Sequence, residues 1–118
     1  MALEEYFATG PAHEKPIFDA VMAQVATLGP VHVEPVSVGI FLKRAGATFV
    51  TLRPMSRWVA AGFSLPRRAR HPTVRRQVAQ YHGKYYHVAN LRSPDEIDPA
   101  LAGLLTEAYL SSGRPGAG

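Results

Sequence analysis

The 118-residue chain contains no cysteine. Disulfide frameworks, zinc–thiolate sites, redox pairs and thiol nucleophiles all need sulfur, so these classes are excluded. The chain also lacks any apolar run that approaches the roughly 18 residues of a membrane-spanning helix. Its first residues do not show the basic-then-apolar pattern of a secretion signal. We therefore expect a cytoplasmic protein without a membrane partner.

Acidic residues are missing from the middle of the chain. Between Pro35 and Pro94 there is no Asp or Glu, whereas this stretch holds eleven of the thirteen Lys and Arg residues. The net charge of the whole chain is only +4, because nine acidic residues, all in the two flanks, offset most of the thirteen basic ones. A cationic block of this kind can be the footprint of an anionic partner. Alternatively, acidic flanking helices could fold back and neutralise it, and the sequence leaves both interpretations open.

The usual sequence signatures of catalysis are also missing. Gly83-Lys84 has neither the upstream glycine nor the following Ser or Thr of a phosphate-binding loop, and there is no dinucleotide fingerprint. None of the serines lies in a Gly-x-Ser-x-Gly elbow. The histidines lack a clustered carboxylate or a close His-x-His pair. We therefore predict no catalytic residue, no metal site and no cofactor.

The pattern of apolar residues predicts one domain over residues 1–113, followed by a Gly/Pro-rich disordered tail at 114–118. An apolar stripe at helical spacing predicts a helix that begins at Lys15 or Pro16 and stops at Gly29. A second helix should run from Pro99 to about Ser112. Residues 3–7 could form one further helical turn, and Thr73 could cap a short helix at 73–80.

Five segments have the composition and period of strands, at 31–35, 38–43, 47–53, 57–65 and 85–91. Short turns around Ala45 and Met55 predict an antiparallel meander for the second to fourth. The predicted class is therefore α+β: an N-terminal helix, an antiparallel sheet of about five strands, and a C-terminal helix packed on one face.

Alternation along these strands predicts the two faces of the sheet. The core face should hold aliphatic and aromatic residues: Val38, Ile40, Leu42, Val50, Leu52, Val59, Ala61, Phe63 and Leu65. The opposite face should combine aromatic and cationic residues: Phe41, Lys43, Phe49, Arg53 and Trp58. That second face is either covered by a chain segment or left as a binding surface.

Five arginines within residues 67–76 form the strongest local signal of an anion site, and a solvated basic loop is the alternative interpretation. Guanidinium groups bind phosphate or carboxylate through two parallel hydrogen bonds, which an ammonium group cannot do. The candidate anion-binding residues are Arg53, Arg57, Arg67, Arg68, Arg70, Arg75, Arg76 and Lys84. The candidate stacking residues are Trp58, Tyr85 and His87. Alternatively, Tyr85 and His87 are core side chains whose polar atoms are satisfied by backbone.

Several packing motifs recur in an order that resembles a known family. They are Leu3-Glu4-Glu5-Tyr6-Phe7, Leu28-Gly29-Pro30, Phe49-Val50-Thr51-Leu52-Arg53, Leu65-Pro66, Tyr86-His87-Val88-Ala89-Asn90-Leu91, Asp95-Glu96-Ile97-Asp98 and Glu107-Ala108-Tyr109. The chain is similar to a small bacterial domain of unknown function that occurs alone or appended to other predicted domains. This resemblance implies an α+β fold and assigns no activity, ligand or catalytic residue.

Three functions remain as hypotheses from the sequence. The first is a non-enzymatic binding module for an anionic partner, either nucleic acid or a phosphorylated ligand. The second is a protein-interaction or self-association module, in which the aromatic face with Phe41 and Trp58 packs on another copy as a homo-oligomer. The third is a small-ligand pocket or enzyme that uses His87, Tyr85 and arginines.

Overall fold

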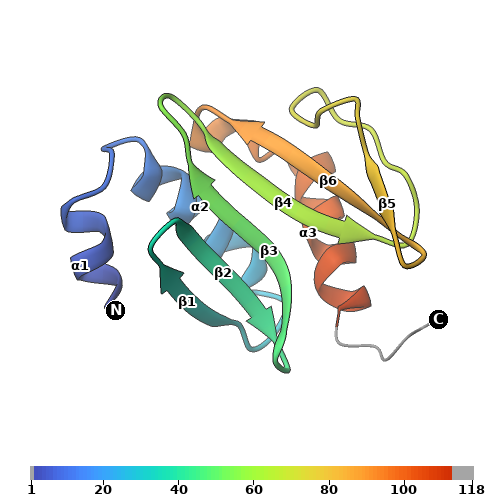
Figure 1. Cartoon of the computed structure of the whole chain (residues 1–118), viewed down its shortest axis with the longest axis horizontal. Helices are drawn as coiled ribbons and strands as arrows, with labels where there is room; N and C mark the ends of the chain where they lie inside the picture. The colour runs from blue at the N-terminus through green and yellow to red at the C-terminus, as the bar shows by residue number, and fades with distance from the viewer. Residues whose placement is uncertain (1, 113–118) are drawn as a thin grey trace.

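Two helices precede a run of antiparallel strands and a third helix follows it in the computed structural model, which describes residues 2–112 (Figure 1). The elements are α1 (Leu3–Ala8), α2 (Glu14–Val25), β1 (His32–Val36), β2 (Gly39–Arg44), β3 (Ala47–Pro54), β4 (Val59–Leu65), β5 (Ala79–Tyr81), β6 (Lys84–Leu91), a 3₁₀ turn (Pro94–Glu96) and α3 (Pro99–Ser111). The predicted fold class is confirmed, with six strands instead of about five within the described residues. The tail predicted at 114–118 lies outside them.

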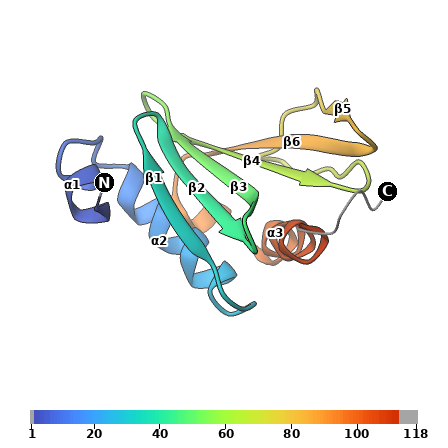
Figure 2. The same ribbon diagram turned by 60° about the horizontal axis from the view of Figure 1, so that its bottom comes forward.

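The strands form one sheet in the order β1-β2-β3-β4-β6-β5, and every neighbouring pair is antiparallel. Helices α2 and α3 lie against one face of this sheet, as Figure 2 shows, and the segment between β4 and β6 rises above the other face at the β6 side. We call these the helix-covered face and the open face. Within residues 2–112, no helix is both long and apolar enough to cross a membrane.

The tight turns of two hairpins explain why the strands pair as they do. Ala45 and Gly46 both have positive φ, at 50° and 82°, and so do His82 and Gly83, at 50° and 77°. Two consecutive residues of positive φ define the turn whose twist matches that of antiparallel strands, and glycine favours this conformation. The first turn joins β2 to β3 as the sequence predicts. The second joins β5 to β6.

The prediction of a short helix at residues 73–80 is wrong. Val74 instead forms a bridge with Ala89, and the backbone N–H of Arg75 donates to the carbonyl of Val88 at 2.9 Å. Residues 76–78 leave the edge of the sheet, and the chain then pairs with β6 again as β5. The outer edge of β6 offers unpaired backbone donors and acceptors, and pairing with them outweighs the local helical preference of this polar segment.

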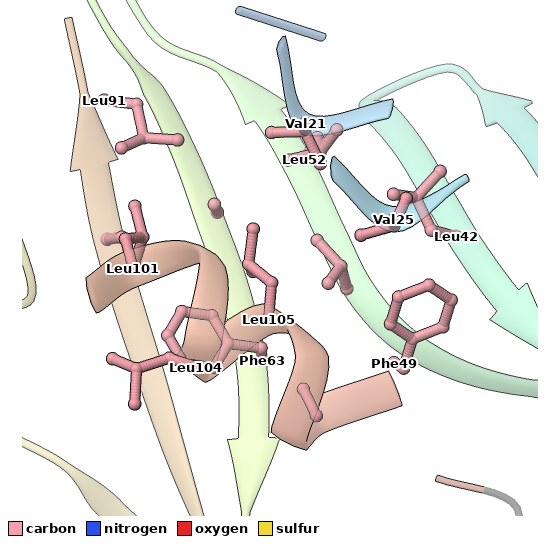
Figure 3. Close-up of a cluster of buried hydrophobic side chains, with 14 of the residues drawn as sticks. Val21, Val25, Leu42, Phe49, Leu52, Phe63, Leu91, Leu101, Leu104 and Leu105 are labelled. Carbon is pink, nitrogen blue, oxygen red and sulfur yellow. The ribbon is translucent and has the colours of Figure 1, made fainter. Parts of the chain in front are cut away.

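The hydrophobic core lies between the helix-covered face and helices α2 and α3 (Figure 3). Eight of the nine predicted core residues are buried: Ile40, Leu42, Val50, Leu52, Val59, Ala61, Phe63 and Leu65. The prediction is wrong for Val38, which is 56% exposed because it lies in the turn between β1 and β2 rather than in a strand. Figure 3 shows Leu101 and Leu105 of α3 among side chains from the sheet.

Phe49 was expected on the open face and is instead buried in the core. The register between β2 and β3 shifts at this point, because Leu42 pairs with Val50 whereas Lys43 pairs with Thr48. Phe49 is the extra residue of the resulting bulge, so the simple two-residue alternation fails there. Its ring packs edge-on against Tyr109 of α3, with ring centres 5.1 Å apart.

Both helix starts near the C-terminus follow their sequence signals. Ser93 and Glu96 form the reciprocal capping box at the 3₁₀ turn, and the Asp98 side chain accepts a hydrogen bond from the backbone N–H of Leu101 at 2.8 Å. Helix α2 begins at Glu14, one or two residues before the predicted start, and ends at Val25, before the predicted stop at Gly29. The buried Glu14 carboxylate accepts a hydrogen bond from the Tyr6 hydroxyl, which ties α1 to α2.

Candidate anion-binding site

The segment between β4 and β5 encloses a hollow at the β6 side of the sheet. In Figure 1 this yellow-green segment loops outward beyond β6 before it returns as β5. The hollow has a volume of about 770 Å³. Its lining residues are Arg68, Ala69, Arg70, His71, Pro72, Val74, Arg75, Arg76 and Val78, which we call the arginine hollow. Four of these nine residues are arginines and none is acidic.

A second hollow of about 560 Å³ continues from the first toward the open face. It shares Arg68, Arg75 and Arg76 with the arginine hollow and extends to Tyr86 and Val88 of β6. Tyr86 and Val88 belong to the open face, since the intervening His87 lies buried on the other side. The two hollows therefore share three arginines of the loop and lead to Tyr86 and Val88 on the open face.

His87 fixes the first part of this loop to the sheet. Its Nε2 accepts a hydrogen bond from the backbone N–H of Ala69 at 3.0 Å, in a fully buried position. Because a backbone N–H can only donate, Nε2 carries no proton and the ring is neutral. Burial lowers the pKa of His87, and the positive charges of Arg67 and Arg68 act in the same direction. Ala69 is thus pinned inward between Arg68 and Arg70, which are both exposed.

His71 fixes the second part of the loop. Its Nδ1 accepts from the backbone N–H of Thr73 at 3.2 Å, so Nε2 carries the proton and donates to Asp98 at 2.9 Å. The N–H of Leu101 and the His71 ring together hold the pKa of Asp98 below its usual value. This carboxylate is therefore engaged at the start of α3, and the loop is anchored at two points by imidazole rings.

Several cations outside the hollow have partners elsewhere in the described part of the chain. Arg67 donates twice to Glu107 of α3, at 3.1 and 2.7 Å, and Lys43 pairs with Glu34. Arg44 donates to the carbonyl of Tyr109 near the end of α3 at 2.7 Å. Of the arginines in residues 67–76, Arg67 is the one that an acidic flank neutralises in the described part of the chain. Neutralisation by the flanks is therefore partial.

The arginines of the hollow have weaker partners or none. Arg68 lies over the ring of Tyr85, with its guanidinium carbon 5.2 Å from the ring centre. Arg75 donates to the side-chain carbonyl of Asn90 at a long 3.4 Å. Within residues 2–112, the side chains of Arg70 and Arg76 form no hydrogen bond or ion pair, and both residues are exposed. Their donors are available to a ligand.

The remaining predicted anion-binding residues lie away from the hollow. Arg53 is exposed on the open face at β3, and Arg57 is in the turn between β3 and β4. Lys84 lies at the start of β6, where its ammonium group approaches the carbonyl of Ser111 at 3.5 Å. The structure thus brings together Arg68, Arg70, Arg75 and Arg76, and it separates them from Arg53, Arg57, Arg67 and Lys84.

The predicted stacking residues need correction. His87 is completely buried and its ring stacks on Phe63, so it is not available to a ligand. The alternative of a core histidine is confirmed, but the backbone satisfies Nε2 alone, because the buried Nδ1 has no hydrogen-bond partner within residues 2–112. Tyr85 pairs with Leu65 in the sheet and shares the helix-covered side with His87. Trp58 is partly exposed, and Arg92 lies over its ring at 5.6 Å.

Tyr86 is the aromatic residue that sequence reasoning missed. It lies on the open face, is 38% exposed and lines the second hollow. Tyr85 and Tyr86 are adjacent near the start of β6, so the alternation of residue types along this strand does not reveal which of the two rings faces the helices. The small residues Ala60, Gly62 and Ser64 at alternate positions of the neighbouring strand were the available signal, because they leave space for a large ring on one face only.

Fold and site together define a small α+β domain with one helix-covered face, one open face and a cationic loop at the sheet edge. The chain belongs to the family described as domain of unknown function DUF5655, whose model matches residues 3–112. This confirms the family resemblance seen in the packing motifs. No curated protein and no solved structure matches the chain.

Proposed function

We propose that this domain is a binding module for a phosphate-bearing ligand, which the arginine hollow receives. The observation that carries the proposal is the convergence of four arginines on one hollow without an acidic lining residue. Like charges held close together repel one another, so such a cluster lowers stability unless an anion compensates it. Arginine is also the side chain best suited to bind phosphate through paired hydrogen bonds.

The backbone around the hollow is held in place before any ligand arrives. His87 holds Ala69, Asp98 holds the His71 ring, and the Asn90 N–H donates to the carbonyl of Thr73, so the loop that carries Arg68 and Arg70 is fixed to β6 and α3. Arg75 is fixed by backbone pairing with β6. A site whose backbone is already ordered loses less conformational entropy on binding, which favours affinity.

A strand with phosphates but no bases tests this proposal directly. We would measure fluorescence polarisation with a labelled 12-nucleotide abasic DNA strand at low salt. If four phosphates are contacted, the affinity should fall about fiftyfold between 50 and 200 mM salt, since each contact contributes a slope of roughly −0.7 for single strands. The Arg70→Gln/Arg76→Gln double variant should bind at least about tenfold more weakly.

The matched control removes the same charge elsewhere. Arg53→Gln/Arg57→Gln also lowers the net charge by two, but neither residue lines the hollow. We expect this control to weaken binding only slightly. Equal losses in both double variants would mean that binding follows net charge alone, and absence of any salt-sensitive binding by the unmodified protein would overturn the proposal.

A further inference from the structure

Tyr86 spans the open face of the sheet instead of standing away from it. It belongs to β6, yet its hydroxyl lies 3.2 Å from the hydroxyl oxygen of Thr51 on β3. Strand β4 lies between these two strands, and neighbouring strands are about 4.8 Å apart. A tyrosine can cover this distance only if its ring lies along the sheet, across β4.

Gly62 of β4 shows how closely the ring approaches the backbone. A Cβ atom at this position would lie 1.8 Å from the Tyr86 hydroxyl oxygen and 2.6 Å from the ring carbon that bears it. Only glycine leaves room for this contact. The inner side of the ring therefore packs directly on the strand, and its exposed 38% belongs to the outer side.

The flat ring adjoins the arginine hollow. Tyr86 lines the second hollow together with Arg68, Arg75 and Arg76, so guanidinium groups and an exposed aromatic ring border one continuous space. This surface therefore offers three arginines beside one exposed aromatic ring. Its charge is complementary to that of a polyanion that carries flat groups.

We infer that the ligand of the arginine hollow is a single-stranded nucleic acid, one of whose bases stacks on Tyr86. This inference rests on the function proposed above. Every base has a π-face that can stack on an aromatic ring, while the backbone phosphates follow a cationic groove. A base inside a duplex is stacked on both sides by its neighbours, so only an unpaired base can lie on a ring that is flat on a sheet.

The test compares a labelled 12-nucleotide thymidine strand, the abasic strand of equal length and a 12-base-pair duplex. The thymidine strand should bind about tenfold more tightly than the abasic strand, because one stacked base contributes roughly five- to 150-fold in affinity. The duplex should bind more weakly than the thymidine strand. In Tyr86→Ala the advantage of the thymidine strand over the abasic strand should disappear, while binding of the abasic strand stays unchanged.

Three further variants separate stacking from other effects. Tyr86→Phe keeps the ring and should keep the preference for thymidine. Gly62→Ala places a methyl group where the ring lies and should abolish that preference without removing any cation. Tyr81→Ala removes another tyrosine of the same hairpin, one that is 72% exposed and outside both hollows, and should bind like the unmodified protein.

The outcomes distinguish failure of this inference from failure of the proposed function. If the thymidine and abasic strands bind equally, or if Tyr86→Ala keeps the difference, base stacking is refuted while phosphate binding stands. Tighter binding of the duplex would refute the single-strand assignment. If a polyglutamate peptide of equal charge binds better than either strand, the partner is an acidic protein. If neither strand binds, both ideas fail.

Discussion

Two groups of cations from the central segment differ in their partners. In the first group each cation meets a fixed group from a distant element: Arg67 meets Glu107, Arg44 meets the last carbonyls of α3, and Arg92 meets the Trp58 ring. In the second group, which lines the arginine hollow, Arg70 and Arg76 have no such partner within residues 2–112. Both groups come from the same acid-free stretch of sequence.

This difference teaches that the charge count of a segment does not identify a site. Arg44 satisfies backbone carbonyls that the end of a helix leaves without intrahelical partners, so its charge has a structural role. Arg67 links the loop to α3 through two parallel hydrogen bonds. Positive charge that remains unmatched after these contacts are subtracted is the part that a ligand can use.

The largest expected effect concerns the anchor of the hollow. His87→Leu removes the acceptor of the buried Ala69 N–H and should lower the free energy of unfolding by about 2–3 kcal/mol, because an unpaired buried donor alone costs roughly 1–3 kcal/mol. Urea denaturation measures this change, with the exposed His32→Leu as control. A loss below about 1 kcal/mol would mean that contacts of the arginines, not this anchor, hold the loop.

The second effect is a pH dependence of stability. Burial lowers the pKa of His87 below its ordinary value of about 6.5, so the unfolded chain takes up this proton first as the pH falls. The contribution of neutral His87 is complete above pH 6.5 and decreases below it. Relative to His87→Leu, the unmodified protein should lose up to about 1.4 kcal/mol per pH unit there, the limit for one proton. Parallel curves for both proteins between pH 7.5 and 5.5 would contradict this.

A smaller effect is expected from the ion pair of the first group. A double-mutant cycle with Arg67→Gln and Glu107→Gln should give a coupling energy of about 0.5 kcal/mol, since the Arg67 side chain is 56% exposed and exposed pairs are weak. Thermal unfolding at low and high salt measures it, and the coupling should shrink at high salt. A coupling energy of zero at both salt concentrations would mean that Glu107 does not stabilise Arg67, and Arg67 would then not belong to the first group.

The smallest effect is expected in the second group. Arg70→Gln and Arg76→Gln should each change the free energy of unfolding by less than about 0.5 kcal/mol, the usual range for surface substitutions. Repulsion between neighbouring arginines makes the expected sign neutral or slightly stabilising. Chemical denaturation of both variants checks this. Destabilisation by 1 kcal/mol or more would show that these arginines support the fold. The distinction between the two groups would then be wrong.

Much of the fold could be predicted because its signals are local. The Asp98-Pro99 cap and the Ser93–Glu96 box mark the helix starts within a few residues. The aliphatic alternation in β2, β3 and β4 indicates which face receives the helices. In these places intrinsic preference, capping and burial agree, so the sequence pattern and the folded structure give the same answer.

The errors arise where long-range pairing decides the structure. The bulge at Phe49 depends on how β2 and β3 align, and β5 forms because β6 has an edge to be paired. Neither is encoded in the period of its own segment. The same holds for the site: the sequence indicates a cluster of arginines, but only the fold shows that Arg67 meets Glu107, forty residues away. It also decides that Tyr86, not Tyr85, faces solvent.

The pairing of β6 with residues 73–75 and 79–81 has a consequence for solubility. Exposed sheet margins are templates on which further copies of a chain can add and grow into fibrils. Here the chain fills most of that margin itself and ends in a strand of only three residues. At the opposite margin, Pro35 of β1 has no N–H to offer an incoming strand. The domain can thus leave one broad side of its sheet uncovered while giving other copies little backbone on which to polymerise.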